Sequence, residues 1–103
     1  MAQQSIRPED VHSPKQHWSL IAVLDDGAGN GPHNNCAMAI GRWDKEPVLA
    51  IRWNGSAENP IGNPQSRGLP TWFIVPPKYR EALLQQGGLA PDKLILARSF
   101  FPL

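Results

Sequence analysis

The side chains of residues 17–24 alternate between two fairly apolar faces of an extended chain, which predicts a β-strand. One face carries Trp18, Leu20, Ala22 and Leu24, and the other carries Ser19, Ile21 and Val23. Residues 36–43 alternate in the same way, and a polar turn at residues 44–46 separates them from residues 47–53, which are rich in β-branched and aromatic side chains. Two such runs joined by a short polar turn are typical of a β-hairpin. Residues 71–75 are a further short run of this kind, so the sequence predicts four strands.

Two long polar segments separate these strands. Residues 25–35 (DDGAGNGPHNN) and residues 54–68 (NGSAENPIGNPQSRG) concentrate Gly, Asn and Pro, which accept positive φ or favour turns and bury little apolar surface. We expect a loop in each place. Residues 1–16 lack periodic apolar positions, and we expect them to form a disordered arm outside the core.

The C-terminal third of the chain predicts one helix. Residues 78–86 follow two prolines, precede two glycines and carry an apolar stripe at helical spacing. Residues 93–101 (KLILARSFF) favour a last extended segment or an irregular tail. The predicted fold is therefore a single α+β domain over residues 17–103, with an antiparallel sheet of four strands, or five if residues 93–101 join it, and one amphipathic helix on its C-terminal side.

Composition and charge narrow the class of protein. The chain has 103 residues, enough for one core, and its formal net charge is +1. Residues 36–80 hold six basic and three acidic residues, so the middle of the chain is mildly basic and compatible with an anionic partner. No apolar run approaches the roughly 18–20 residues of a membrane span, and residues 1–10 lack the apolar centre of a signal peptide, so we expect a soluble, cytoplasmic protein.

The sequence predicts no enzyme, no metal site and no cofactor. His12, His17 and His33 lack the short spacing that places two metal ligands on one element. The glycines of residues 25–35 are followed by neither a helix pattern nor a phosphate-binding lysine, and the acidic residues there suit turn chemistry better than calcium binding. Cys36, the only cysteine, lies in an alternating strand and is expected to pack; a small enzyme using Cys36 or His33 is the third-ranked hypothesis.

Aromatic and basic residues occur together in the mildly basic middle of the chain. Single-stranded nucleic acid is bound by rings that stack on bases and by Lys or Arg that contact phosphate. The alternative is that the tryptophans are buried in the core or in a dimer or partner interface, while the arginines face solvent. The candidate nucleic-acid-binding residues are Arg42, Lys45, Arg52, Trp53, Arg67 and Trp72.

The stretches AIGRWDKEPVLAIRW (residues 39–53) and TWFIVPPKYREALL (residues 71–84) resemble the hairpin and the strand-to-helix passage of the transcriptional coactivator and Whirly class of single-stranded-DNA-binding domains, especially its small bacterial members. The resemblance implies a homodimer that forms through the helix and a curved sheet that receives single-stranded DNA. It points to Arg42, Lys45, Arg52 and Trp53 as residues that face the DNA.

We therefore expect a non-enzymatic, homodimeric module that binds single-stranded DNA or RNA, as an accessory protein of transcription or DNA maintenance. The second hypothesis is a protein-interaction module whose aromatic residues form a dimer or partner interface.

Overall fold

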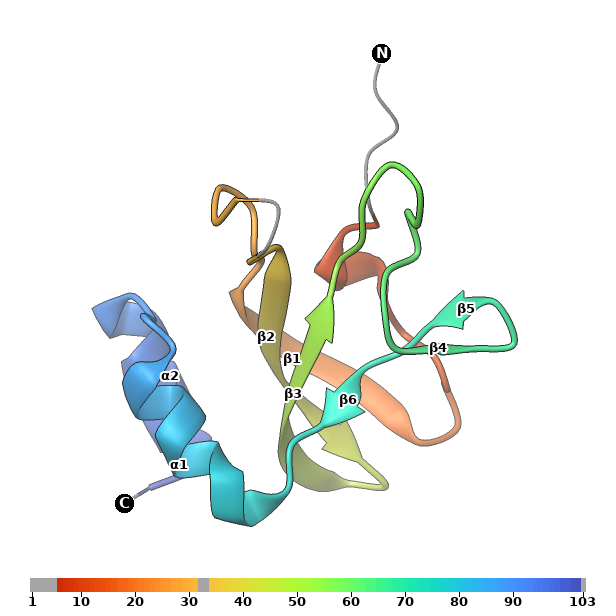
Figure 1. Cartoon of the computed structure of the whole chain (residues 1–103). Helices are drawn as coiled ribbons and strands as arrows, with labels where there is room; N and C mark the ends of the chain where they lie inside the picture. The colour runs from red at the N-terminus through yellow and green to blue at the C-terminus, as the bar shows by residue number, and fades with distance from the viewer. Residues whose placement is uncertain (1–5, 32–33, 103) are drawn as a thin grey trace.

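The computed structural model describes residues 6–31 and 34–102, and it shows a four-stranded antiparallel sheet in the order β1-β2-β3-β6 (Figure 1). A separate two-stranded sheet is formed by β4 and β5. The predicted α+β class with a four-stranded antiparallel sheet is confirmed. In chain order the elements are the 3-10 helix η1 (Pro8–Asp10), β1 (Trp18–Asp25), β2 (Cys36–Trp43), β3 (Glu46–Trp53), β4 (Gln65–Ser66), β5 (Leu69–Pro70), β6 (Phe73–Ile74), α1 (Pro77–Gln86) and α2 (Pro91–Phe100).

The predicted hairpin is the pair β2–β3, which runs in continuous register from Cys36 opposite Trp53 to Trp43 opposite Glu46. The turn between the strands is formed by residues 44 and 45, whose φ values are 50° and 81°. Positive φ at both central positions is typical of a type I′ turn, whose twist matches that of the strands. A two-residue turn fixes the register, and the register decides which face of the sheet each side chain occupies.

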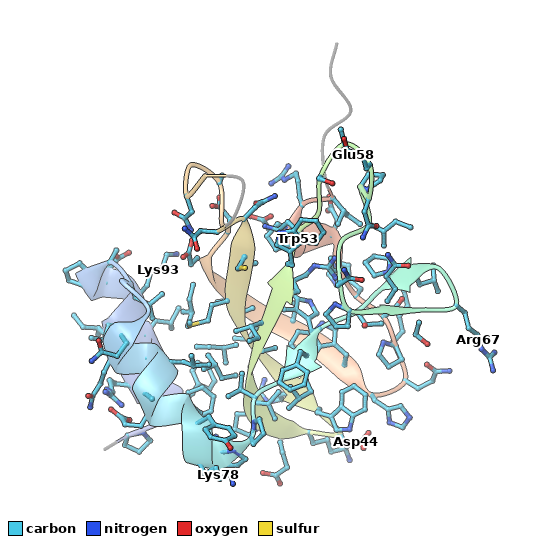
Figure 2. All side chains as sticks on the ribbon, viewed as in Figure 1. Asp44, Trp53, Glu58, Arg67, Lys78 and Lys93 are labelled. Atoms are coloured by element: carbon cyan, nitrogen blue, oxygen red, sulfur yellow. The ribbon has the colours of Figure 1, made fainter. Side chains whose placement is uncertain are left out.

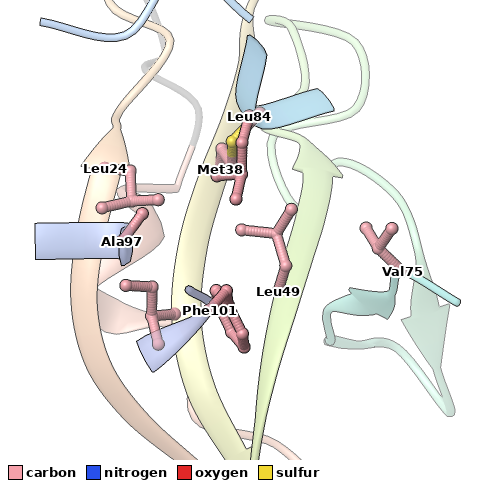
Figure 3. Packing of buried hydrophobic residues seen from close by; sticks show 8 residues of the cluster. Leu24, Met38, Leu49, Val75, Leu84, Ala97 and Phe101 are labelled. Atoms are coloured by element: carbon pink, nitrogen blue, oxygen red, sulfur yellow. The ribbon is translucent and has the colours of Figure 1, made fainter. Parts of the chain in front are cut away.

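Both helices cover one face of the sheet (Figure 1). The sheet contributes alternate residues of β2, Met38 and Ile40, which have Ile51 and Leu49 opposite them on β3. The two helices are joined to each other by Arg98, whose guanidinium donates two hydrogen bonds of 2.6 and 2.5 Å to the Glu81 carboxylate. The buried residues of this core, shown in Figure 3, are Leu24, Met38, Ile40, Leu49, Val75, Leu84, Ala97 and Phe101.

Residues 93–100 belong to helix α2 and Phe101 caps its C-terminus, so the prediction of an extended segment at residues 93–101 is wrong, and with it the prediction of a single helix. Leu94, Ala97 and Phe101 face the core at helical spacing, whereas Ile95 is 72 % exposed. A short apolar run fits either period, and here packing on the sheet decides between them. Among residues 6–31 and 34–102, no helix has the length and apolar character required to cross a membrane.

The opposite face of the sheet is covered by the N-terminal segment and by the segment that follows β3. Val11 is fully buried, and its carbonyl oxygen accepts a 3.0 Å hydrogen bond from Trp72 Nε1. The Trp72 ring lies 5.7 Å from the Trp18 ring, over small β2 and β3 side chains. The expectation that residues 1–16 stay outside the core is therefore wrong for Val11, because its partner lies far along the chain; residues 1–5 lie outside the described residues.

Candidate functional site

The six predicted nucleic-acid-binding residues do not lie together. Lys45 lies in the β2–β3 turn and Arg42 lies near the end of β2, and Arg67 lies at the tip of the β4–β5 hairpin. Figure 2 shows Trp53 at the other end of β3, remote from Asp44 in that turn. Arg52 and Trp72 are buried, with 2 % and 6 % of their surface exposed.

Arg52 is a structural residue. Its guanidinium donates a 2.5 Å hydrogen bond to the Thr71 carbonyl oxygen and another to the Ile61 carbonyl oxygen, with a longer contact to Trp53 O. Burial lowers the pKa of Arg52 from its ordinary 12.5 to about 10, because desolvation disfavours the charged form. The side chain therefore attaches the segment after β3 to the sheet, and a phosphate cannot reach it in this conformation.

Trp53 lines an apolar hollow of about 280 Å³ on the helix-covered face of the sheet. Its other walls include Cys36, Ile51 and Phe73, and the last of these is 53 % exposed on the edge strand β6. This surface has aromatic side chains but offers no exposed cation among its lining residues. It fits the second hypothesis, an interface with a protein, better than it fits phosphate binding.

Two adjoining hollows gather the exposed basic residues. The first, of about 330 Å³, is lined by Lys15, Arg42, Asp44 and Lys45 among others. The second, of about 630 Å³, includes Lys15 and Arg67. Lys15 lies in the wall of both, so the two hollows form one continuous surface. We name Lys15, Arg42, Lys45 and Arg67 the basic surface; all four side chains are exposed.

A stacked pair of rings lies beside the basic surface. The imidazole of His17 lies 5.2 Å from the Trp43 ring at an interplanar angle of 21°. Its Nδ1 lies 2.6 Å from Asp44 Oδ1, and the Asp44 backbone N–H donates a 2.9 Å hydrogen bond to the His17 carbonyl oxygen. The chain therefore holds His17 in place on two sides and leaves its side chain 50 % exposed.

The backbone of the basic surface is strained. Among the residues that the structure describes, the non-glycine residues with positive φ are Asp44, Lys45 and Arg67, at 50°, 81° and 55°. All three lie in the turns of the two hairpins. A side chain other than Gly, Asn or Asp is rarely found in this conformation, and such strain concentrates at functional sites.

Sequence reasoning missed Lys15, His17 and Trp43 as members of this site. Trp43 pairs with Trp18 across β1 and β2, which places His17 beside the β2–β3 turn. The one signal in the sequence was the β1 strand, since an antiparallel β1–β2 pair brings the start of β1 to the end of β2.

The other residues considered for chemistry are the acidic loop at residues 25–35, candidate metal ligands, Cys36 and His33. The Asp25 carboxylate accepts a 2.9 Å hydrogen bond from the Gly27 backbone N–H, as turn residues do. Within residues 6–31 and 34–102, no three His, Cys, Asp or Glu side chains are grouped in a way that could hold a metal ion. Cys36 is exposed, so the expectation that it packs is wrong. His33, the other residue of the third hypothesis, lies outside the described residues, so that hypothesis stays a prediction.

No family model, no curated protein and no solved structure matches the chain. The resemblance to the transcriptional coactivator and Whirly class therefore stays a prediction, and the geometry of the site carries the functional argument.

Proposed function

We propose that the protein binds single-stranded DNA or RNA through the basic surface. The observation that carries the proposal is the left-handed backbone of Lys45 and Arg67, φ 81° and 55°, at the tips of two different hairpins. Glycine would occupy such positions without strain, so basic side chains there require a reason other than folding. Contact with an anion is such a reason.

The neighbouring rings support a chain of nucleotides rather than a lone anion. The His17 side chain is half exposed and stacks on Trp43, and a base can extend this stack on the outer side of the imidazole. Each base stacked on an aromatic ring contributes about 1–3 kcal/mol. Phosphates would then meet the cations on either side. Trp72 and Arg52 take no part in this proposal because both are buried.

The salt dependence of binding tests the proposal. Contact between the four cations and four phosphates predicts a slope of about −3 in the logarithm of the association constant against the logarithm of salt concentration. Affinity for a labelled oligothymidine would then fall about 50-fold between 50 and 200 mM salt, measured by fluorescence anisotropy. Arg42→Gln and Arg67→Gln should each weaken binding, whereas Lys78→Gln on α1 should not. No binding at micromolar protein in low salt contradicts the proposal.

A second candidate function rests on the apolar hollow at Trp53. Here the module would bind a protein or a second copy of itself, with Phe73 and Trp53 as the contact residues. Phe73→Ser tests this separately, because Phe73 is half exposed and lines the apolar hollow but neither hollow of the basic surface. The variant should lose self-association or partner binding while it keeps its melting temperature and its affinity for oligothymidine.

The homodimer implied by the resemblance is a further part of the proposal. It would form through the helices, where Tyr79 on α1 and Ile95 on α2 are 54 % and 72 % exposed. Sedimentation equilibrium of the wild type and of Ile95→Lys tests it. If the wild type is a monomer at a concentration on the order of 100 micromolar, dimerisation through the helices is contradicted. The proposal that the basic surface binds nucleic acid is not affected by that result.

A further inference from the structure

The hydrogen bonds of His17 leave one ring nitrogen for a ligand. Nδ1 faces the Asp44 carboxylate at 2.6 Å, so Nδ1 carries the hydrogen and donates it to Oδ1. The second nitrogen, Nε2, has no hydrogen bond to any of the residues that the structure describes. Nε2 is an acceptor in the neutral imidazole and a donor in the protonated one. A phosphate oxygen, which only accepts, can therefore bond to Nε2 only when His17 is protonated.

The charges around His17 make its protonation matter. The first hollow of the basic surface holds the cations Lys15, Arg42 and Lys45 and the carboxylate of Asp44. Glu46, the first residue of β3, lies directly after the turn and is exposed. With a neutral His17, Asp44 keeps its full negative charge where a phosphate would approach. With a protonated His17, the His17–Asp44 pair is neutral, so the three cations act on the phosphate without opposition from Asp44, and Glu46 remains as the neighbouring carboxylate.

The His17 ring is also held in a fixed position, so a change in its charge acts directly on a bound phosphate. It is stacked on Trp43 and tied to the turn by the backbone bond from Asp44 to His17, so protonation need not move it. Histidine is the side chain whose charge changes between pH 5 and 8, whereas Lys and Arg remain charged throughout that range. His17 is thus held in one place beside the cations of the basic surface.

We propose that binding of single-stranded nucleic acid to the basic surface is coupled to the uptake of one proton at His17, whose Nε2–H donates to a phosphate oxygen. This inference rests on the proposed function. It adds His17 as a phosphate-contacting residue and makes affinity a function of pH within the range in which cells vary it. In the bound state the protonated ring donates two separate hydrogen bonds: Nδ1–H to the Asp44 carboxylate, and Nε2–H, which carries the proton taken up, to the phosphate.

The test is the affinity for oligothymidine at pH 5.5, 6.5, 7.5 and 8.5 at constant ionic strength, since thymine and phosphodiesters keep their charge over this range. The wild type should bind roughly tenfold more weakly at pH 8.5 than at pH 5.5, the change that corresponds to a shift of one unit in the titration of one group. His17→Gln should bind equally at all four values, at or below the wild-type affinity at pH 8.5. His12→Gln, which removes an exposed histidine outside both hollows, should keep the wild-type pH profile.

Asp44→Asn provides an independent variant. Asparagine tolerates positive φ, so the turn is retained, and loss of the carboxylate should raise the affinity at pH 8.5 above that of the wild type. Affinity that is independent of pH in the wild type, or a pH profile that survives His17→Gln, overturns proton coupling while the proposed function stands. Absence of binding at every pH in low salt overturns both. Melting temperatures of all variants separate loss of folding from loss of binding.

Discussion

Replacement of Lys45 by glycine should stabilise the fold and weaken nucleic-acid binding at once. Lys45 is exposed and has a φ of 81°. A left-handed residue with a Cβ costs roughly 1–2 kcal/mol relative to the ordinary region, and glycine avoids this cost. The greater freedom of glycine in the unfolded chain returns about 0.4–1 kcal/mol of that gain. The net free energy of unfolding should therefore rise by about 0.5–1 kcal/mol, by the difference of these two terms.

Two measurements on the same variant check this. For a domain of this size a stabilisation of 1 kcal/mol raises the melting temperature by about 4–8 °C, so Lys45→Gly should melt about 2–8 °C above the wild type. The salt slope for oligothymidine should fall in magnitude by about 0.7, because one phosphate contact with a single strand is lost. Lys45→Asn, which keeps the left-handed turn and removes the charge, should show the same loss in slope.

The same substitution at Lys93 is the matched control. Lys93 lies inside helix α2, where glycine should lower stability by about 1 kcal/mol, and the binding slope should not change. A lower melting temperature for Lys45→Gly would refute the strain argument. An unchanged salt slope in both Lys45 variants would refute the assignment of Lys45 to phosphate contact.

Three further predictions concern the fold that carries the site. Arg52→Met should lower the free energy of unfolding, measured by urea denaturation, by about 3 kcal/mol. The carbonyl oxygens of Ile61 and Thr71 lose their donor, and each buried unpaired group costs about 1–3 kcal/mol. A loss below about 0.5 kcal/mol would show that water replaces the guanidinium without cost. The hydrogen bond from Arg98 holds the pKa of Glu81 at about 2, below its ordinary 4.5, so the stability from this pair is complete above pH 4.5 and is lost as pH falls towards 2. The melting temperature of Glu81→Gln should therefore fall less than that of the wild type over this range, while Glu58→Gln in the loop should follow the wild type. Gly41→Ala should lower the free energy of unfolding by about 1–3 kcal/mol in the same urea assay, because a Cβ at Gly41 would lie 2.2 Å from Trp18 Cη2. An unchanged urea midpoint would mean that the Trp18 ring is free to move aside.

Local patterns predicted the parts of the fold that depend on neighbours in the chain. The β2–β3 hairpin and helix α1 follow from alternation, a polar turn and prolines followed by a helical stripe. Helix α2 was predicted as extended because its apolar run is compatible with both periods, and only the sheet face beneath it selects one. The burial of Val11 depends on Trp72, 61 residues later, and no local pattern contains that information.

The arrangement of the candidate residues likewise depends on contacts between distant parts of the chain. Arg42-Trp43 and Arg52-Trp53 are identical dipeptides, but they fall on opposite faces of the sheet, since Arg52 pairs with Ala37 and Trp53 with Cys36. Trp43 packs towards the N-terminal segment, whereas Trp53 lies on the face that the helices cover. The sequence shows which residues are basic or aromatic, but it does not show which face of the sheet each one occupies until the pairing of the strands is known.

The way in which Arg52 holds the segment after β3 has a consequence for protein engineering. Its bonds to Ile61 and Thr71 bracket the β4–β5 hairpin, so the position of that hairpin is set at its base and not at its tip. At the tip, a Cβ added to Gly68 would meet no atom within 4 Å. Residues 67 and 68, between the paired strands β4 and β5, are therefore the place at which a foreign loop, an epitope or a recognition peptide should be inserted, and the scaffold would display the insert beside the sheet.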